Sequence, residues 1–183
     1  MRQWSGFATG KATTGHVIRH VPRDYKIFAE IPEGWEYPQI HAYVEQKIDN
    51  WLKHRKASGL STDQRRADVR DFIQAWRIPY DPSKYANKWW KLEANRPVRT
   101  LLAHLGKDTY SHIHFDSSQA RTISVREAAR LQSFPDGFVF KCSMNPAFKQ
   151  IGNAVPALFA YAIAMCMRTA LGAPKIADMR VSL

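Results

Sequence analysis

The stretch that decides the fold is Lys149-Gln-Ile-Gly-Asn-Ala-Val-Pro156, which leads directly into the apolar run 157–171. Gly152 and Asn153 predict a tight turn, because glycine accepts a positive φ and asparagine tolerates one. Pro156 suits the first turn of a helix. The run therefore predicts a helix that is apolar nearly all the way round and buried on most of its sides. By spacing alone, this is a core helix after a turn.

A second block lies upstream and reads Arg121-Thr-Ile-Ser-Val-Arg-Glu-Ala-Ala-Arg-Leu-Gln-Ser-Phe-Pro-Asp136. Its segment Ser124-Val-Arg-Glu127 is a capping box, which predicts a helix that begins there and ends before the Phe-Pro pair. The box accounts for the carboxylate of Glu127 without a catalytic role. We expect Arg126 and Arg130 on the surface of this helix, as charge partners.

The two blocks, in this order and over residues 121–156, closely resemble the last two sequence blocks of the DNA cytosine-5 methyltransferases. A looser similarity continues upstream through 99–108, 113–114 and 15–19. Those pieces look like the target-recognition region that bacterial members of the family place before the final blocks. The chain is therefore identified as the carboxyl-terminal part of such an enzyme.

The resemblance implies a fold of the α/β class, present here as an α+β fragment. Residues 1–120 would form a target-recognition domain with mixed helices and short strands. Residues 121–183 would be the C-terminal helical piece of a Rossmann-like methyltransferase domain. The apolar run 157–171 would then pack on parts of that domain that this sequence does not contain. The resemblance also places four residues at the rim of the S-adenosylmethionine site: Gly152, Asn153, Ala154 and Val155.

In this family a cysteine thiolate adds to carbon 6 of a flipped-out cytosine, and carbon 5 then takes a methyl group from S-adenosylmethionine. The sequence contains none of the blocks that do this: no Phe-x-Gly-x-Gly, Pro-Cys-Gln, Glu-Asn-Val or Gln-x-Arg-x-Arg. Cys142 and Cys166 match no nucleophile block. We therefore assign no catalytic residue and expect the chain to be inactive without a partner chain that carries Pro-Cys-Gln and Glu-Asn-Val.

The composition favours a polyanionic partner. The formal net charge is +11, from 27 Lys and Arg against 16 Asp and Glu. Six Trp, seven Tyr and nine Phe interleave with the basic residues, which suits nucleic acid better than a merely solubilising surface. The resemblance to the methyltransferases implies double-stranded DNA as that partner. Two cysteines make no disulfide framework, so we expect a cytoplasmic protein. The apolar run is interrupted by Arg168 and is too short to span a membrane.

From Pro38 the apolar residues recur at helical spacing, and Ser61-Thr-Asp-Gln64 is a second capping box. The pattern predicts a helical hairpin over about 38–76. We expect Arg65 and Arg66 at its connection to contact DNA phosphates, which would position DNA without reading its sequence. A solvated run of charge is the alternative.

Residues 98–115 favour a strand hairpin around Gly106-Lys-Asp108. Within it we expect four residues to influence target choice: Arg99, Thr100, His104 and Lys107. His112 and His114 would share one side of a strand, yet no further ligands have suitable spacing, so we predict no metal site. Between the two hairpins, Tyr80, Tyr85, Trp89 and Trp90 alternate with lysines, a mixture that suits either base contacts or a core.

Three functions remain open from the sequence. The chain is the recognition subunit of a split cytosine-5 methyltransferase, a truncated non-catalytic remnant of a single-chain enzyme, or a stand-alone DNA-binding module. The two final blocks argue against the third, because DNA binding alone does not need the rim of a cofactor site. An adjacent reading frame with Pro-Cys-Gln and Glu-Asn-Val would favour the first.

Overall fold

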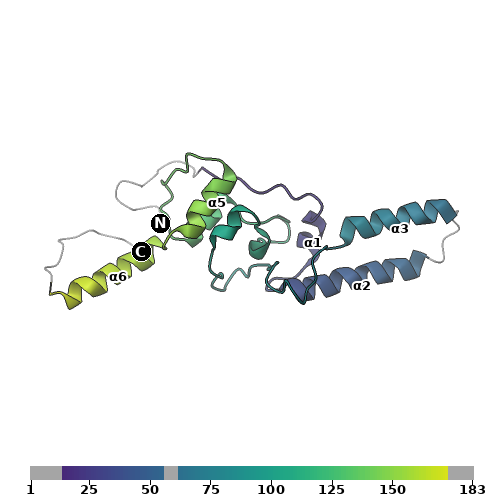
Figure 1. Cartoon of the computed structure of the whole chain (residues 1–183), viewed down its shortest axis with the longest axis horizontal. Coiled ribbons are helices and arrows are strands. Elements are labelled where there is room, and N and C mark those ends of the chain that lie inside the picture. The colour runs from purple at the N-terminus through teal and green to yellow at the C-terminus, as the bar shows by residue number, and fades with distance from the viewer. Residues whose placement is uncertain (1–13, 56–61, 173–183) are drawn as a thin grey trace. The chain divides into compact units, whose positions relative to one another are not determined.

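The structure is a computed structural model that describes residues 14–55 and 62–172. The described part is mostly helical (Figure 1), with six α-helices and two short 3₁₀ helices. Their bounds are α1 Tyr25–Glu30, α2 Tyr37–Arg55, α3 Thr62–Trp76, η1 Ala103–Gly106, η2 Tyr110–His112, α4 Val125–Leu131, α5 Met144–Asn153 and α6 Ala157–Ala170.

The expected strand hairpin at 98–115 is wrong. This segment instead contains η1 and η2. Within the described ranges, β pairing is confined to three isolated bridges, Glu36 with Trp90, Lys91 with Ile113, and Ile113 with Thr122. The mixture of helices and short strands expected before residue 120 is therefore replaced by helices and irregular backbone. The family's α/β class is not visible as a sheet in this part of the chain.

The contacts divide the chain into two compact units, each assembled from separate stretches. The hairpin unit comprises the described residues within 20–97 and 110–122, and the carboxyl-terminal unit comprises those within 14–19, 98–109 and 123–172. The functional division that we expected at residue 120 stays a prediction.

Helices α2 and α3 of the hairpin unit lie where the sequence predicts helices, and they pack side by side (Figure 1). Tyr37, Ile40, Val44 and Ile48 recur at helical spacing along α2 and are buried, which gives that helix one apolar face. The capping box expected at 61–64 begins outside the described residues. The two helices together contain six Lys and Arg and five Asp and Glu, so their net charge is close to zero.

A buried lysine holds the core of the hairpin unit together. The Nζ of Lys91 donates hydrogen bonds to the carbonyls of Phe28 and Ile31, at 2.7 and 2.8 Å, and to the Oγ of Ser117 at 2.6 Å. Burial lowers the pKa of this ammonium group. The three acceptors use the three donors of a lysine, which offsets part of the desolvation cost.

The buried hydroxyl of Tyr37 gives the hairpin unit a predictable pH response. It donates a 2.6 Å hydrogen bond to the carbonyl of Tyr80, and burial raises the pKa of Tyr37 to about 12. Between pH 10 and 12 the unfolded chain loses this proton while the folded chain keeps it, so the free energy of unfolding falls as the pH rises. We expect Tyr37→Phe to flatten this fall, measured by urea unfolding of both proteins at pH 9 to 12. Equal slopes for the two proteins would contradict the assignment.

Candidate functional site

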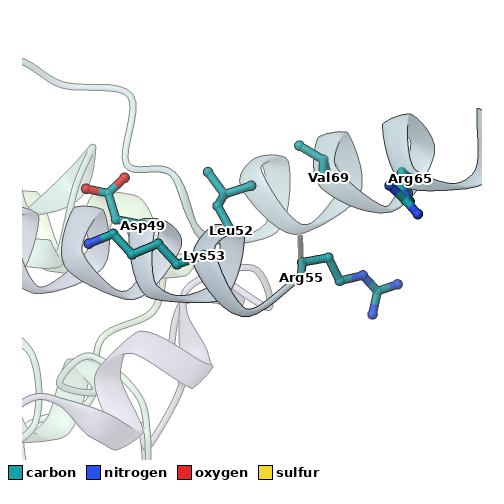
Figure 2. A pocket seen from close by; sticks show the side chains of 6 residues that line it. All are labelled: Asp49, Leu52, Lys53, Arg55, Arg65 and Val69. Atoms are coloured by element: carbon teal, nitrogen blue, oxygen red, sulfur yellow. The ribbon is translucent and has the colours of Figure 1, made fainter. Parts of the chain in front are cut away.

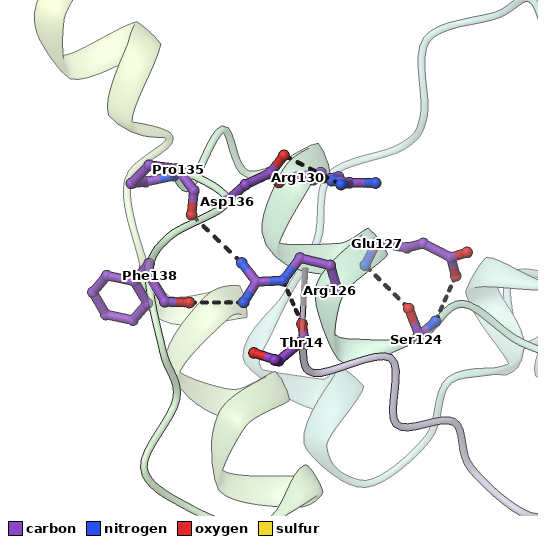
Figure 3. A network of polar contacts seen from close by, with 8 residues as sticks. All are labelled: Thr14, Ser124, Arg126, Glu127, Arg130, Pro135, Asp136 and Phe138. Atoms are coloured by element: carbon purple, nitrogen blue, oxygen red, sulfur yellow. Dashed lines mark hydrogen bonds and ion pairs between the residues drawn. The ribbon is translucent and has the colours of Figure 1, made fainter. Parts of the chain in front are cut away.

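The segment Arg121–Asp136 forms helix α4 and the turn after it, and the expected capping box is present. The Oγ of Ser124 accepts a hydrogen bond from the amide of Glu127, and the carboxylate of Glu127 accepts one from the amide of Ser124. Figure 3 shows both bonds. The carboxylate of Glu127 is therefore used at the helix start, as predicted.

Arg126, in contrast, is buried, so its expected position on the helix surface is wrong. Its side chain is 1% exposed, and its guanidinium donates to the carbonyls of Thr14 (2.8 Å), Pro135 (3.4 Å) and Phe138 (2.7 Å). Figure 3 shows the group reaching from α4 to the backbone at Thr14 and to two carbonyls of the turn after α4. Burial lowers the pKa of Arg126. One positive charge, satisfied by carbonyl dipoles, thus ties the carboxyl-terminal unit together.

Arg130 has the surface role that we expected. It pairs with Asp136 through two hydrogen bonds of 2.7 and 3.2 Å, and it is 38% exposed while Asp136 is 4% exposed. The hydrogen bond that Arg130 donates to Asp136 raises the pKa of Arg130. The pair fixes the turn that follows α4.

Gly152 and Asn153 do not form the predicted tight turn. Both are helical and end α5, and the positive φ angles of the described residues occur elsewhere. Gly152 is required for another reason: a Cβ at this position would lie 2.2 Å from the carbonyl oxygen of Leu102 and 2.5 Å from the amide nitrogen of Ala103. Only glycine lets α5 approach the backbone at the start of η1 so closely.

The residues after α5 connect it to α6 through an extended segment. Ala154 and Pro156 have ψ angles of 143° and 127°. The side-chain amide of Gln132 donates to the carbonyls of Ile151 and Ala154, both at 3.1 Å, so the turn after α4 holds this connection. Asn153 is exposed, and Val155 is 63% exposed. The segment thus presents two side chains to solvent beside a backbone that is held in place, which fits the rim of a ligand site.

Helix α6 has no buried residue, contrary to the expected burial on most sides. Phe159, Ile163 and Met167 are 58%, 42% and 59% exposed. The stretch Met144–Ala170 even reaches the length and mean hydropathy, 1.4, of a membrane span, which we did not expect. The extended residues 154–156 interrupt it, and α6 alone has 14 residues, about 21 Å, which is shorter than a bilayer core.

His104 and Lys107 line a hollow of about 710 Å³ in the carboxyl-terminal unit. Asn145 and Lys149 of α5 line it too, and no acidic residue does. Arg19 donates to the carbonyl of Gly106 at 3.2 Å and to the Oδ1 of Asn145 at 2.9 Å, which orients that side-chain amide. The hollow combines two residues predicted from the sequence with two that the sequence analysis did not select. Its positive lining suits a phosphate.

The other expected DNA contacts are dispersed. Arg99 is half-buried and Thr100 is exposed, and neither lines this hollow. Arg65 lines a second hollow, of about 520 Å³, together with Asp49, Leu52, Lys53, Arg55 and Val69. Figure 2 shows these six side chains on α2 and α3. Arg66 is exposed and lies 4.0 Å from Asp63. Arg65 and Arg66 thus have different surroundings despite being adjacent.

No group of three metal-binding side chains occurs among the residues described. His112 and His114 are 1% and 8% exposed. The Nδ1 of His112 lies 3.0 Å from the Oγ of Ser111, and the Nδ1 of His114 accepts a 3.2 Å hydrogen bond from the amide of Asp116. Both imidazoles are therefore part of local hydrogen bonding.

Comparison with known proteins identifies the family. The sequence profile described as C-5 cytosine-specific DNA methylase matches residues 9–168, which is most of the chain. The chain belongs to this family. The match includes both final blocks, η1 and both hollows, so the residues discussed above are part of a DNA methylase sequence.

The relatives carry methyltransferase names. The putative type II methyltransferase M.OihORF3336P of Oceanobacillus iheyensis is 46% identical over 155 residues, 85% of this chain and 32% of its own length. M.XorII of Xanthomonas oryzae is 31% identical, over 85% of this chain and 40% of its own length. The DNA (cytosine-5-)-methyltransferase M.ApeKI of Aeropyrum pernix is 33% identical, over 56% of this chain and 22% of its own length. The chain thus spans less than half the length of each. No solved structure matches it.

Proposed function

We propose that this chain supplies DNA target recognition and the rim of the S-adenosylmethionine site to a DNA cytosine-5 methyltransferase. The assembled enzyme would transfer a methyl group from S-adenosylmethionine to carbon 5 of cytosine in a specific DNA sequence. Residues 121–183 would complete a Rossmann-like domain, and the catalytic cysteine would come from a partner chain. The protein would act in the cytoplasm.

The observation that carries this proposal is the exposure of α6. The helix directly follows the Gln-Ile-Gly-Asn-Ala-Val-Pro block, and its aromatic and aliphatic side chains lie in solvent. A contiguous apolar surface of this kind is typical of an interface. The chain also spans only 32% of its relative M.OihORF3336P, so family members contain much more protein that could cover the helix. We infer that a catalytic partner chain with Pro-Cys-Gln and Glu-Asn-Val packs on α6.

The DNA contacts follow from the distribution of charge. We propose that Arg99, Thr100, His104 and Lys107 influence target choice from the segment around η1, and that Arg65 and Arg66 contact phosphates. The hollow beside η1 supports part of this proposal, because Lys107 and Lys149 line it without any carboxylate.

The test is a methyl-transfer assay with labelled S-adenosylmethionine and mixed-sequence DNA. The purified chain is compared with the chain co-expressed with a family polypeptide that contains Pro-Cys-Gln and Glu-Asn-Val. We expect transfer in the mixture only. Transfer by the chain alone would contradict the absence of a nucleophile and direct attention to Cys142, which is exposed. No transfer in either sample, from soluble protein, would favour a truncated remnant or a stand-alone DNA-binding module.

Asn153→Ala provides a separate test of the cofactor rim. The side chain is exposed at the end of α5, so its loss should leave the fold intact. We expect the assembled enzyme to bind S-adenosylmethionine about tenfold more weakly, the effect of losing one hydrogen bond to a ligand, with DNA affinity nearly unchanged. Titration calorimetry with the cofactor measures this. An unchanged cofactor affinity would remove Asn153 from the site.

A further inference from the structure

The loop 77–88 of the hairpin unit contains two tyrosines and two lysines whose side chains are not among the DNA contacts proposed above. Tyr80 is 37% exposed and Tyr85 is 51% exposed. Their ring centroids lie 5.8 Å apart at an interplanar angle of 66°, and the Nζ of Lys88 lies 4.3 Å from the centroid of the Tyr80 ring. Lys84 is exposed in the same loop. We call Tyr80, Lys84, Tyr85 and Lys88 the tyrosine–lysine patch.

The backbone beneath the patch is held in one conformation. The buried hydroxyl of Tyr37 donates to the carbonyl of Tyr80 at 2.6 Å. The carboxylate of Asp81 accepts from the amide and the hydroxyl of Ser83, at 2.9 and 2.7 Å. The amides of Lys84, Tyr85 and Lys88 donate within the loop. The patch is therefore preorganised, which lowers the entropy cost of binding.

The structure separates these tyrosines from the aromatic residues that form the core. Trp89 is fully buried and stacks on Tyr110 at 4.8 Å, so this neighbour in the sequence is a core residue. Tyr80 and Tyr85 are absent from the core cluster and from the partly buried residues that pack against it. Packing of the core thus does not explain two large rings on the surface.

The sequence from 77 to 107, which contains the patch, has an excess of positive charge. Residues 77–107 contain seven Lys and Arg against two Asp and Glu, whereas α2 and α3 are nearly neutral. Of the seven, Lys91 is buried, and Arg96 pairs with Glu93 at 3.1 Å. Lys84 and Lys88 lie on the loop, and its acidic residue Asp81 accepts a hydrogen bond from the amide of Ser83. The loop therefore has a positive surface beside two phenolic hydroxyls.

We propose that the tyrosine–lysine patch binds the phosphate backbone of duplex DNA outside the bases that are read. Lysine ammonium groups and tyrosine hydroxyls both donate hydrogen bonds to phosphate oxygens, and such contacts position DNA without selecting its sequence. This inference rests on the proposed recognition function. It adds a further contact region on the hairpin unit, besides Arg65 and Arg66 on α3 and the segment around η1.

The test measures binding of the full chain to a dye-labelled mixed-sequence duplex by fluorescence anisotropy over a range of salt concentrations. We expect the double variant Lys84→Ala, Lys88→Ala to bind more weakly and to lower the slope of log K against log salt by about 2, one unit for each phosphate contact. The matched control is Arg70→Ala with Arg96→Ala, which removes the same charge from two exposed residues outside the patch. The slope of log K against log salt should change less for this control than for the lysine variant.

Tyr80→Phe with Tyr85→Phe retains both rings and removes both hydroxyls. We expect it to weaken binding about tenfold with an unchanged salt slope. Thermal melting checks that each variant is folded. If the wild type binds DNA and the lysine variant has the affinity and salt slope of the wild type or of the control, the proposed role of the patch is wrong. The proposed recognition function is then unaffected. If the wild type binds no DNA, both fail. Tighter binding to polyglutamate than to the duplex would overturn DNA as the partner.

Discussion

Gly152→Ala is expected to destabilise the carboxyl-terminal unit by about 3 kcal/mol or more. The added methyl group would lie 2.2 Å from the carbonyl oxygen of Leu102, 2.3 Å from its carbonyl carbon and 2.5 Å from the amide of Ala103. These are backbone atoms, so no side-chain rotation relieves the overlap. Helix α5 must move away from η1, and with it the backbone that leads to Asn153.

Hydrogen exchange of peptides from 98–109 and 144–153 measures this effect where it arises. The matched control is Gly172→Ala, where an added Cβ has no atom within 4 Å but the φ of 65° is strained for alanine. That strain costs about 1–2 kcal/mol, so we expect a clearly smaller loss. If Gly172→Ala destabilises as much as Gly152→Ala, close approach to Leu102 is not the reason for glycine at 152.

Arg126→Met is expected to cost about 3 kcal/mol of stability. Methionine fills much of the volume but donates no hydrogen bond, so the carbonyls of Thr14, Pro135 and Phe138 lose their guanidinium donor. An unsatisfied buried carbonyl costs about 1–3 kcal/mol, and water that enters would recover part of it. Arg126→Lys retains the charge with a shorter and less branched donor, so its loss should be intermediate.

Urea unfolding at neutral pH compares these variants with Arg96→Met. Arg96 is 73% exposed and pairs with Glu93 on the surface, where such a pair contributes at most about 1 kcal/mol. We expect the order of stability to be Arg96→Met, Arg126→Lys, Arg126→Met, with the first nearest the wild type. A loss for Arg126→Met as small as that for Arg96→Met would show that the buried charge costs as much as its three bonds contribute.

The structural role of Gly152 also bears on the cofactor proposal. The four residues from 152 to 155 were selected together from the sequence, yet they differ in the structure. The Cβ position of Gly152 is occupied by the backbone of Leu102, whereas Asn153 and Val155 lie in solvent. We therefore expect Gly152 to act through the position of α5, and Asn153 to contact the cofactor directly. The two substitutions separate these roles, because Gly152→Ala should change stability and Asn153→Ala should not.

The sequence by itself determined the features that depend on neighbouring residues. The capping box at Ser124, the amphipathic spacing along α2 and the family blocks all involve contacts within a few residues or a motif that can be read directly. Each of these predictions was confirmed where the described residues test it. The location of the hairpin helices follows from the same periodicity, because one apolar face must be buried.

The tertiary structure alone decided the features that depend on residues far apart in the chain. Segment 98–115 has the composition of strands, but with few residues paired beside it the backbone forms η1 and η2. The helical pattern predicts Arg126 on the surface. In the structure its guanidinium donates to the carbonyl of Thr14, which is 112 residues away in the sequence. The Gly-Asn pair predicts a turn at Gly152. In the structure glycine is needed there because the backbone of Leu102 lies against it. Local patterns predict local conformation, whereas burial and close approach are set by which distant segments meet.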